Sequence, residues 1–528
     1  MFKMIEKTVK NLVEQHPRKI IFSSGLLSAL AFAPFNFMII LFLCLPIFYL
    51  IISNSINHKK AFVNGLIFGY GFFLAGIYWI AISLLVDVKR FAWLIPFALT
   101  IIPGFLALYF GVLASLFYLI VNRFKIIFSY QKIILLAILW VIIEMMRSTL
   151  FSGFAWNLLG YSALFSIAFS QIASLFGVYF LSFFIVLIAL APIYFFEKKL
   201  NKIDKIFLVI LTIFVITNFG YGLVKLSANT PTDSLNPINI RMVQANINQE
   251  MKWDQQQKYQ NLIKHIDLTR SKSLENIDAV VWSESSVPYI IEDNDQLFKI
   301  LKLATSKNSI LITGALRVER NHNQEIEKIF NSVFVIDNNS VSDSYDKHHL
   351  VPFGEYVPLQ KFLSFLFIDN IVDKITGGGM GFSSGVGAKT IQTNKFSFNP
   401  LICYEVIFSS EIIDKNQKPD LFINVTNDAW FKNSSGPYQH LASAQMRSIE
   451  YSIPMIRVAG TGVSAGIDNY GRIVDKIAFN QEGVSDVKLF KNKYKSFYHQ
   501  YGNYPLLLIM GILLLLVFKD KIKKLANR

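Results

Sequence analysis

The sequence predicts a multi-domain membrane protein in which a bundle of transmembrane helices carries one large α/β domain. Hydrophobic residues make up 53% of the 528 residues and charged residues only 16%, against about 25% charged residues in an average soluble protein. Long apolar stretches crowd the first 224 residues and return at the end of the chain. Residues 225–503 instead alternate short apolar runs with polar segments. This contrast predicts a separate domain between two membrane regions.

Eight apolar stretches are candidates for membrane-spanning helices. Most of them reach the roughly 18 apolar residues that can cross a bilayer as a helix. They lie at 19–34, 37–53, 61–84, 91–121, 131–150, 166–196, 206–224 and 504–518. We therefore expect a bundle of about seven helices over residues 1–224. Residues 504–528 should add one more helix and a basic tail.

The distribution of charge orients this bundle. Lys and Arg gather in alternate connecting segments, whereas the short loops of the other side hold only Lys89 and Arg90. Cytoplasmic loops of membrane proteins carry such an excess of Lys and Arg. The formal net charge of +15 is therefore explained by topology and does not indicate a nucleic-acid partner. We expect both termini in the cytoplasm and residues 225–503 on the opposite side of the bilayer.

Glu144 and Arg147 are charged residues within the apolar stretch 131–150. Because they are three residues apart, they lie on one face of a helix. Charges inside a membrane are costly and usually functional. Two interpretations stay open, a self-neutralising pair or a site at which Arg147 meets a lipid phosphate. The other stretches are nearly free of charge, which disfavours a transporter or channel.

The region 225–503 predicts an α/β domain with both faces of its sheets covered. Near-continuous apolar strands that alternate with helices are typical of this class. The strand candidates are 238–247, 277–285, 309–319, 331–339, 396–405, 420–430 and 454–468. Amphipathic helices are expected at 255–275 and 438–451.

Cys403 stands at the end of one of these apolar runs, in "NPLICYEVIF". The other cysteine of the chain, Cys44, lies in the second apolar stretch, so a disulfide within the outer domain is excluded. Glu284 and Asp428 also follow strand candidates, and strand ends are where α/β folds commonly carry catalytic groups. A buried core thiol and a nucleophile both remain open for Cys403.

A cysteine reacts as its thiolate and therefore needs a base or a cation nearby. The candidate bases are His348, His349 and His440, or Glu284 if burial raises the pKa of its carboxyl group. A lysine could stabilise both the thiolate and a tetrahedral oxyanion, but spacing alone does not select Lys347. The chain shows neither zinc-type Cys/His spacing nor the Gly-Lys-Ser/Thr of a phosphate loop. We expect no metal and no cofactor.

Three segments resemble the signatures of the nitrilase, or carbon–nitrogen hydrolase, superfamily. They are "VVWSESSVP", "YDKHHLVPFGEYVP" and "LICYEVIF". With the membrane region and stretches such as "GFAWNLLGYS" and "VQANINQEMKW", nearly the whole chain resembles the bacterial apolipoprotein N-acyltransferases. The resemblance implies a nitrilase-like αββα sandwich on a multi-span bundle in the bacterial inner membrane, with the sandwich in the periplasm.

The resemblance also implies a reaction. A fatty acyl chain would pass from a phospholipid to a cysteine thioester, and then to the N-terminal amine of a diacylglyceryl-cysteine lipoprotein. This ping-pong acyl transfer completes lipoprotein maturation. A membrane-anchored nitrilase-type amidase with a small soluble substrate is the alternative, although one helix would suffice as its anchor. We expect a monomer in either case.

Roles for single residues follow from the same resemblance. Glu284 would be the general base, Lys347 would stabilise the oxyanion and Cys403 would be the acylated nucleophile. Glu355 would be a second essential carboxylate, and Tyr404 and Glu405 complete the cysteine segment. The remaining candidates for substrate binding are Trp253, Trp430, Arg147 and Glu144. This chain departs from the usual family pattern at Ser283 and Ser286, where Pro and Ala are common.

Overall fold

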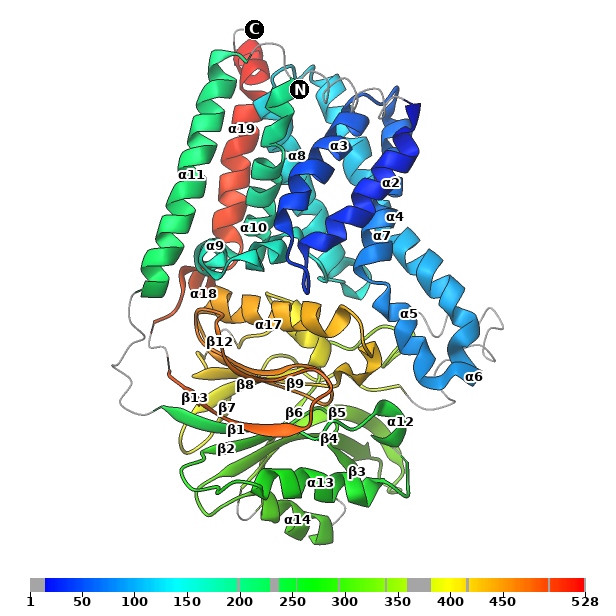
Figure 1. Ribbon diagram of the computed structural model, residues 1–528, viewed down its shortest axis with the longest axis vertical. Helices are drawn as coiled ribbons and strands as arrows, with labels where there is room; N and C mark the ends of the chain where they lie inside the picture. Colours follow the sequence, from blue (N-terminus) through cyan, green and yellow to red (C-terminus); the bar gives the residue numbers. More distant parts are fainter. Residues whose placement is uncertain are drawn as a thin grey trace. The chain divides into compact units, whose positions relative to one another are not determined.

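The computed structural model describes residues 15–196, 200–227, 237–252, 254–292, 295–337, 340–358, 381–414, 417–491 and 494–526 (Figure 1). The chain divides into two compact units. Unit 1 comprises Met1–Ala81, Leu94–Ala228 and Ser496–Arg528, and unit 2 comprises Ile82–Trp93 and Asn229–Lys495. The short segment Ile82–Trp93 thus groups with the α/β part of the chain, where Leu85 accepts a hydrogen bond from Lys432 Nζ (3.0 Å). This grouping was not predicted from the sequence.

The apolar region folds into helices. They are α2 (Pro17–Ser28), α3 (Leu41–Ser53), α4 (His58–Gly76), α5 (Trp79–Ser83), α7 (Ile95–Arg123), α8 (Ser129–Thr149), α9 (Ile167–Ser170), α10 (Ala173–Ala189), α11 (Lys202–Ser227), α18 (Phe497–Tyr501) and α19 (Tyr504–Ala526). Aromatic rings fill the space between α3, α4, α7 and α8. Phe48 and Phe68 lie 4.4 Å apart between ring centroids, and Phe110 and Trp140 lie 5.0 Å apart. Such aromatic pairs contribute about 0.5–1.5 kcal/mol each beyond the area they bury.

A glycine allows α4 and α7 to approach each other closely. A Cβ atom added to Gly65 of α4 would lie 2.2 Å from the backbone oxygen of Phe110 in α7. The absence of a side chain therefore lets the two helices meet backbone to backbone, as small residues do in membrane bundles.

Within the described residues, four helical segments are long and apolar enough to cross a membrane. They are Ala92–Arg123, Ser129–Ser152, Ala173–Phe195 and Lys202–Ser227, and the bent pair His58–Gly76 with Trp79–Asp87 would make a fifth. Two shorter apolar helices cover Met38–Ser53 and Tyr504–Lys519. The expected number of eight spans is not confirmed. Hydropathy predicts where apolar sequence lies, but it does not predict where a helix breaks, as the chain does after Gly76.

Unit 2 contains two β-sheets. The first has the strand order β13-β1-β2-β4-β5-β6, with β3 paired to β4, and the second has the order β12-β11-β10-β9-β8-β7. The strands are β1 (Ile238–Gln244), β2 (Ala279–Trp282), β3 (Val287–Ile290), β4 (Ile310–Arg320), β5 (Ile326–Ile336), β6 (Val341–Asp346), β7 (Ile391–Gln392), β8 (Ser397–Ile402), β9 (Leu421–Thr426), β10 (Met455–Ala459), β11 (Ser464–Ile467), β12 (Ile473–Ile477) and β13 (Gly483–Leu489). The helices of this unit include α6 (Val88–Phe91), α12 (Gln249–Lys252), α13 (Lys258–Arg270), α14 (Asp295–Leu301) and α17 (Gly436–Tyr451).

The two sheets face one another across an apolar core and carry helices on their outer faces. The core between the sheets includes Ile240, Met242, Val281, Val333, Phe398, Ile423 and Val458. Leu262 and Ile266 of α13 pack on the outer face of the first sheet. On the outer face of the second, Phe422 of β9 meets Tyr451 of α17, with ring centroids 5.9 Å apart. Unit 2 is therefore an αββα sandwich, as the resemblance implied (Figure 1).

Most elements of this sandwich were predicted from apolar runs. Each of the seven strand candidates overlaps a strand, and the two helix candidates overlap α13 and α17. The candidate 454–468 proves to be two antiparallel strands, because the chain reverses between β10 and β11 and pairs Met455 with Ile467. Strands β12 and β13 were missed because exposed polar residues interrupt them.

Strand β13 joins the end of the domain to its beginning. It pairs antiparallel with β1, in a register that sets Ile238 opposite Leu489. Arg241 of β1, which is fully buried, forms a bidentate ion pair with Asp486 of β13 at 2.7 Å for both contacts. Its guanidinium also donates to the backbone oxygens of Thr269 and Lys272. Bidentate geometry with satisfied donors favours such an ion pair in a buried position.

Candidate active site

Cys403 occupies a sharp turn at the end of β8. All six residues of β8 are buried, and the chain then enters the short 3₁₀ helix η9 (Cys403–Ile407). Cys403 has a φ of +50°, in the left-handed region that few residues other than glycine adopt. Such a conformation persists only where the surrounding structure holds it, and it is concentrated at functional sites. The left-handed turn therefore marks Cys403 as a candidate functional residue.

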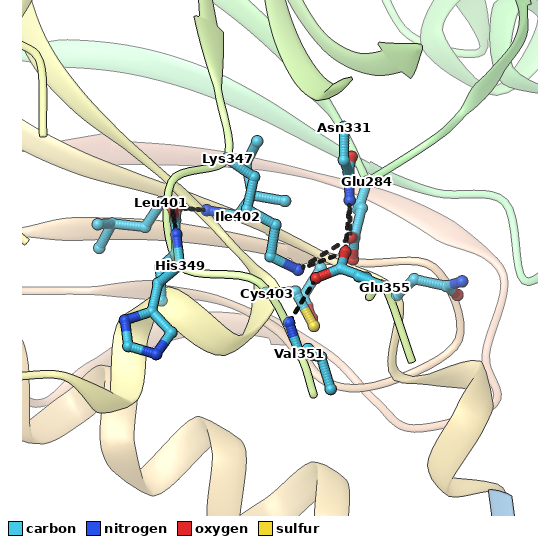
Figure 2. Close-up of polar contacts among 12 residues, drawn as sticks. Glu284, Asn331, Lys347, His349, Val351, Glu355, Leu401, Ile402 and Cys403 are labelled. Atoms are coloured by element: carbon cyan, nitrogen blue, oxygen red, sulfur yellow. Dashed lines mark hydrogen bonds and ion pairs between the residues drawn. The ribbon is translucent and has the colours of Figure 1, made fainter. Parts of the chain in front are cut away.

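Glu284 and Lys347 reach the same place from the ends of two strands of the first sheet. Glu284 follows β2 and Lys347 follows β6, and both side chains are buried. The ammonium of Lys347 lies 2.8 Å from Glu355 Oε1 and 3.8 Å from Glu284 Oε1. Figure 2 shows the two carboxylates and the ammonium converging beside the sulfur of Cys403. The structure thus brings together the four residues that the sequence placed in the site.

Asn331 links the two carboxylates, and it was not among the residues selected from the sequence. Its Nδ2 atom donates to Glu284 Oε1 (2.7 Å) and to Glu355 Oε1 (3.2 Å). Asn331 stands within β5, where it begins the apolar run "NSVFVI" and resembles any strand residue. The signal that could have found it is chemical, since a buried amide in a strand needs hydrogen-bond partners.

The contacts of Glu355 come from donors alone. Oε1 accepts hydrogen bonds from Lys347 Nζ and Asn331 Nδ2, and Oε2 accepts one from the N–H of Val351 (2.8 Å) (Figure 2). A carboxylate has acceptor sites on both oxygens and fits this arrangement. Glu355 therefore fixes both the lysine and the loop that follows it.

The electrostatics of the site keep the lysine charged and the thiol protonated. Burial opposes the charge of Lys347, but the carboxylates of Glu355 and Glu284 raise its pKa well above the ordinary value. Burial, reinforced by the charge of Glu284, raises the pKa of the Cys403 thiol to about 12, although Lys347 acts in the opposite direction. The resting cysteine is therefore a thiol, and it must lose its proton during attack.

Glu405 ties the cysteine turn to the segment that carries Lys347. One of its oxygens accepts from the hydroxyl of Tyr345 (2.9 Å) and from the N–H of His348 (2.8 Å), and the other accepts from the N–H of Ile402 (2.7 Å). Burial alone would raise the pKa of Glu405, but its hydrogen bond and ion pair with His348 hold it below the ordinary value. Tyr404 is buried, and its ring contacts those of His349 and Phe408.

Lys252 is a second buried cation near the site. It was not selected from the sequence, in which the neighbouring Trp253 was the candidate. Lys252 ends α12 and is 8% exposed, and its Nζ donates to the backbone oxygen of Glu284 at 2.7 Å. Burial lowers the pKa of Lys252 to about 8, while the charges of Glu284 and of a Cys403 thiolate would raise it. The ammonium therefore holds the peptide of the proposed base and adds a positive charge to its surroundings.

The three histidines considered as bases form hydrogen bonds with other groups. His348 pairs with Glu405 (2.7 Å) and His349 pairs with Glu411 (2.7 Å). His440 contacts the backbone oxygen of Cys403 (3.0 Å). These contacts favour Glu284, which reaches the same place as the thiol, as the base of the site.

The structure describes three of the four candidates for substrate binding. Trp253 falls outside the described residues, and Trp430 of the turn η10 (Asp428–Phe431) is 43% exposed. In unit 1, Glu144 accepts hydrogen bonds from Trp140 Nε1 (3.0 Å) and from the N–H of Leu159 (2.7 Å).

Arg147 is equally engaged within unit 1. It is 3% exposed and donates to the backbone oxygens of Phe154 (2.5 Å) and Trp156 (2.7 Å). These hydrogen bonds give Glu144 and Arg147 a structural role, since they hold the segment that follows α8. Binding of a lipid phosphate by Arg147 stays a prediction.

The comparisons with known proteins cover nearly the whole chain. Residues 24–191 match the apolipoprotein N-acyltransferase N-terminal domain, and residues 239–497 match the carbon-nitrogen hydrolase family. An apolipoprotein N-acyltransferase from Rickettsia prowazekii is 38% identical over 93% of this chain and 96% of its own length. The chain belongs to the apolipoprotein N-acyltransferase family.

Other members of the apolipoprotein N-acyltransferase family show the same extent of similarity. The protein from Rickettsia typhi is 38% identical over 95% of this chain and 99% of its own length. The protein from Rhodopseudomonas palustris is 34% identical over 94% of both chains. Since each match includes the helical region as well as the sandwich, the family assignment covers both units.

Proposed function

We propose that this chain is an N-acyltransferase that moves a fatty acyl chain from a phospholipid to the N-terminal amine of a diacylglyceryl-cysteine lipoprotein. The acyl chain would pass through a thioester on Cys403. The observation that carries the proposal is the convergence of Glu284, Lys347 and Glu355 on a cysteine at a strained strand end. The family assignment supports a lipoprotein substrate, and the phospholipid donor is part of the proposal.

In the first half-reaction, the sulfur of Cys403 attacks the ester carbonyl carbon of the phospholipid while Glu284 takes the thiol proton. The carbonyl oxygen becomes an oxyanion, which the ammonium of Lys347 and the N–H of Tyr404 stabilise. When the tetrahedral intermediate collapses, the C–O bond breaks and Glu284 returns the proton to the departing oxygen. The products are a lysophospholipid and the Cys403 thioester.

In the second half-reaction, the neutral amine of the lipoprotein attacks the thioester carbonyl carbon. Glu284 now takes a proton from the amine, and collapse of the intermediate breaks the C–S bond. The proton passes to the departing sulfur and restores the thiol. The sum is one ester and one amine converted to one amide and one alcohol, and the enzyme is unchanged. The thiol pKa of about 12 fits this sequence, because it makes a protonated sulfur the resting state.

The excess of Lys and Arg in alternate connecting segments supports a membrane location with those segments in the cytoplasm. We place both termini in the cytoplasm and the sandwich on the outer side of a bacterial inner membrane, where lipoprotein acceptors carry their diacylglyceryl group. The catalytic domain would extend over residues 225–503. A monomer is sufficient for this chemistry, since unit 2 contains all the proposed catalytic residues.

Intact-mass measurement of the detergent-purified protein after incubation with phospholipid tests the proposal. We expect a gain of one fatty acyl mass that hydroxylamine removes. Cys403→Ala should show no gain, whereas Cys44→Ala is the matched control, because Cys44 is fully buried in α3, and should acylate normally. Addition of a diacylglyceryl peptide should discharge the thioester. Alkylation of Cys403 without any acylation by lipid would instead favour the small-molecule amidase.

A further inference from the structure

His440 lies behind the catalytic cysteine on the buried side of α17. It is fully buried, and its ring joins the turns that follow β8 and β9. Nε2 lies 3.0 Å from the backbone oxygen of Cys403, and Nδ1 lies 3.0 Å from Asp428 Oδ1. A carbonyl oxygen can only accept a hydrogen bond, so Nε2 carries a hydrogen in either charge state of the ring. His440 therefore donates to the carbonyl group of Cys403.

Two fully buried side chains hold the imidazole of His440 in this orientation. Nη2 of Arg457, in β10, lies 2.7 Å from Asp428 Oδ2 and 3.1 Å from His440 Nδ1. Burial opposes the charge of Asp428, but Arg457 and His440 keep its pKa at about 2. Thr426 adds a hydrogen bond to Asp428 Oδ1 (3.0 Å). The ring is thus locked by charges and hydrogen bonds that do not include the thiol.

The carbonyl group that His440 binds belongs to the peptide between Cys403 and Tyr404. A trans peptide is planar, and its C=O and N–H bonds point in opposite directions. Fixing the oxygen toward α17 consequently fixes the N–H of Tyr404 on the side away from α17. A hydrogen bond to the oxygen also polarises the peptide and strengthens its N–H as a donor. The positive φ of Cys403 makes such support necessary, because this backbone conformation is unfavourable by itself.

We propose that His440 is a positioning residue that orients and polarises the Cys403–Tyr404 peptide, and so prepares its N–H to stabilise the oxyanion of acyl transfer. The inference rests on the proposed function, since only acyl transfer forms that oxyanion. It assigns His440, Asp428 and Arg457 to one hydrogen-bonded chain that ends at the reacting group. In this role His440 acts on the peptide and takes no proton from the thiol.

The test separates reactions that form an oxyanion from one that does not. Thioester formation from phospholipid passes through a tetrahedral intermediate, whereas alkylation of the same sulfur by iodoacetamide is a direct displacement. Both rates are measured at Cys403 by mass spectrometry on the full-length protein in detergent. The variants are His440→Leu, which removes the donor, and His440→Gln, whose amide can still donate to the carbonyl. His265→Leu is the matched control, because His265 is also a buried histidine of unit 2 but hydrogen-bonds the backbone of its own helix.

Removing one oxyanion donor typically slows acyl transfer about 10²–10³-fold. Since His440 acts on that donor only through the carbonyl oxygen of the same peptide, the effect should be smaller. We expect His440→Leu to slow thioester formation about 10- to 100-fold. Alkylation should change less than about twofold, and His440→Gln should recover most of the acylation rate. His265→Leu should leave both rates near those of the unmodified protein even if its thermal midpoint falls.

Three results would overturn the inference. Acylation of His440→Leu at the unmodified rate would show that the peptide does not need the imidazole. An equal loss of acylation and alkylation would mean that the histidine places the sulfur and not the oxyanion donor. If His440→Leu does not fold, His440→Gln decides between the two outcomes. A His440→Gln protein that has a normal thermal midpoint but still acylates slowly would contradict the hydrogen-bond role. Absence of a thioester in the unmodified protein is a separate result, which removes the proposed function together with this inference.

Discussion

Replacing Glu355 by glutamine should disable the site while leaving its shape nearly intact. Glu355 accepts from Lys347 and Asn331 on one oxygen and from the N–H of Val351 on the other. A carboxamide has one oxygen and one NH₂ group, so one of these donors must face another donor in either orientation. Glutamine can therefore accept hydrogen bonds either from Lys347 and Asn331 or from the N–H of Val351, but not from both sides.

The size of the expected loss follows from the two orientations that the new carboxamide can adopt. If the amide oxygen faces Lys347, the N–H of Val351 loses its acceptor, which costs about 1–3 kcal/mol for a buried group. If the NH₂ group faces Lys347, a buried ammonium loses its nearest anion, and breaking a buried pair in this way costs about 3–5 kcal/mol. The first orientation is favoured, yet it also removes a negative charge 2.8 Å from the ammonium. Lys347 is then drawn to Glu284, now 3.8 Å away, and pairs with the base.

A loss of about 3 kcal/mol of transition-state stabilisation corresponds to roughly a 100-fold slower reaction. We therefore expect Glu355→Gln to form the Cys403 thioester about 100-fold more slowly, as measured by intact mass in a single turnover. Glu319→Gln is the matched control, because Glu319 forms an exposed ion pair with Arg317 (2.9 Å), and such pairs contribute little. A Glu355→Gln protein that acylates within about threefold of the unmodified rate would refute the reasoning.

Three further predictions concern pH. Because the thiol pKa of Cys403 is about 12, its alkylation by iodoacetamide should accelerate continuously from pH 7 to 9, and a plateau below pH 9 would contradict this. Lys252 has its folded pKa lowered to about 8, so between pH 8 and about 10 the unfolded chain binds more protons than the folded one, and stability should rise with pH. The thermal midpoint of Lys252→Met should lack this rise. An unchanged slope in that variant would count against a buried ammonium. Asp428 has its folded pKa depressed to about 2, so its contribution of about 2 kcal/mol should be present above pH 4 and lost between pH 4 and 2. Asp428→Asn should be less stable at pH 7 and lose less on acidification than the unmodified protein, which circular dichroism against pH can measure.

The sequence predicted those parts of the fold that local pattern determines. Strand β9 was found because "LFINV" is apolar on both faces, and it is indeed buried on both. Strand β13 was missed because exposed residues alternate along it, and its pairing with β1 joins segments more than 200 residues apart. Likewise, apolar composition identified the stretch 61–84 but not the break after Gly76. Long-range pairing and helix breaks depend on packing partners that no local window contains.

The residues of the site also divide into those that the sequence identified and those that only the structure reveals. Glu284, Lys347, Glu355 and Cys403 were selected by resemblance and lie together in the structure. Asn331 was not selected, since it stands in an ordinary strand run. His440 was considered only as a base and not as a positioning residue, since it stands in an ordinary amphipathic helix. Their roles arise only when two sheets and α17 are brought together. Substrate binding by Trp430, Arg147 and Glu144 stays a prediction, and Trp253 lies outside the described residues.

The pairing of β1 with β13 also has a consequence for biosynthesis. The strand that starts the sandwich finds its outer neighbour only in residues 483–489, close to the end of the domain. Until those residues have been made, β1 presents an open sheet edge, and open edges invite pairing with other chains. Arg241 meanwhile has no Asp486 to neutralise it. A nascent chain that ends before residue 483 is therefore inactive, and it also exposes an unpaired strand edge that chaperones and proteases can recognise.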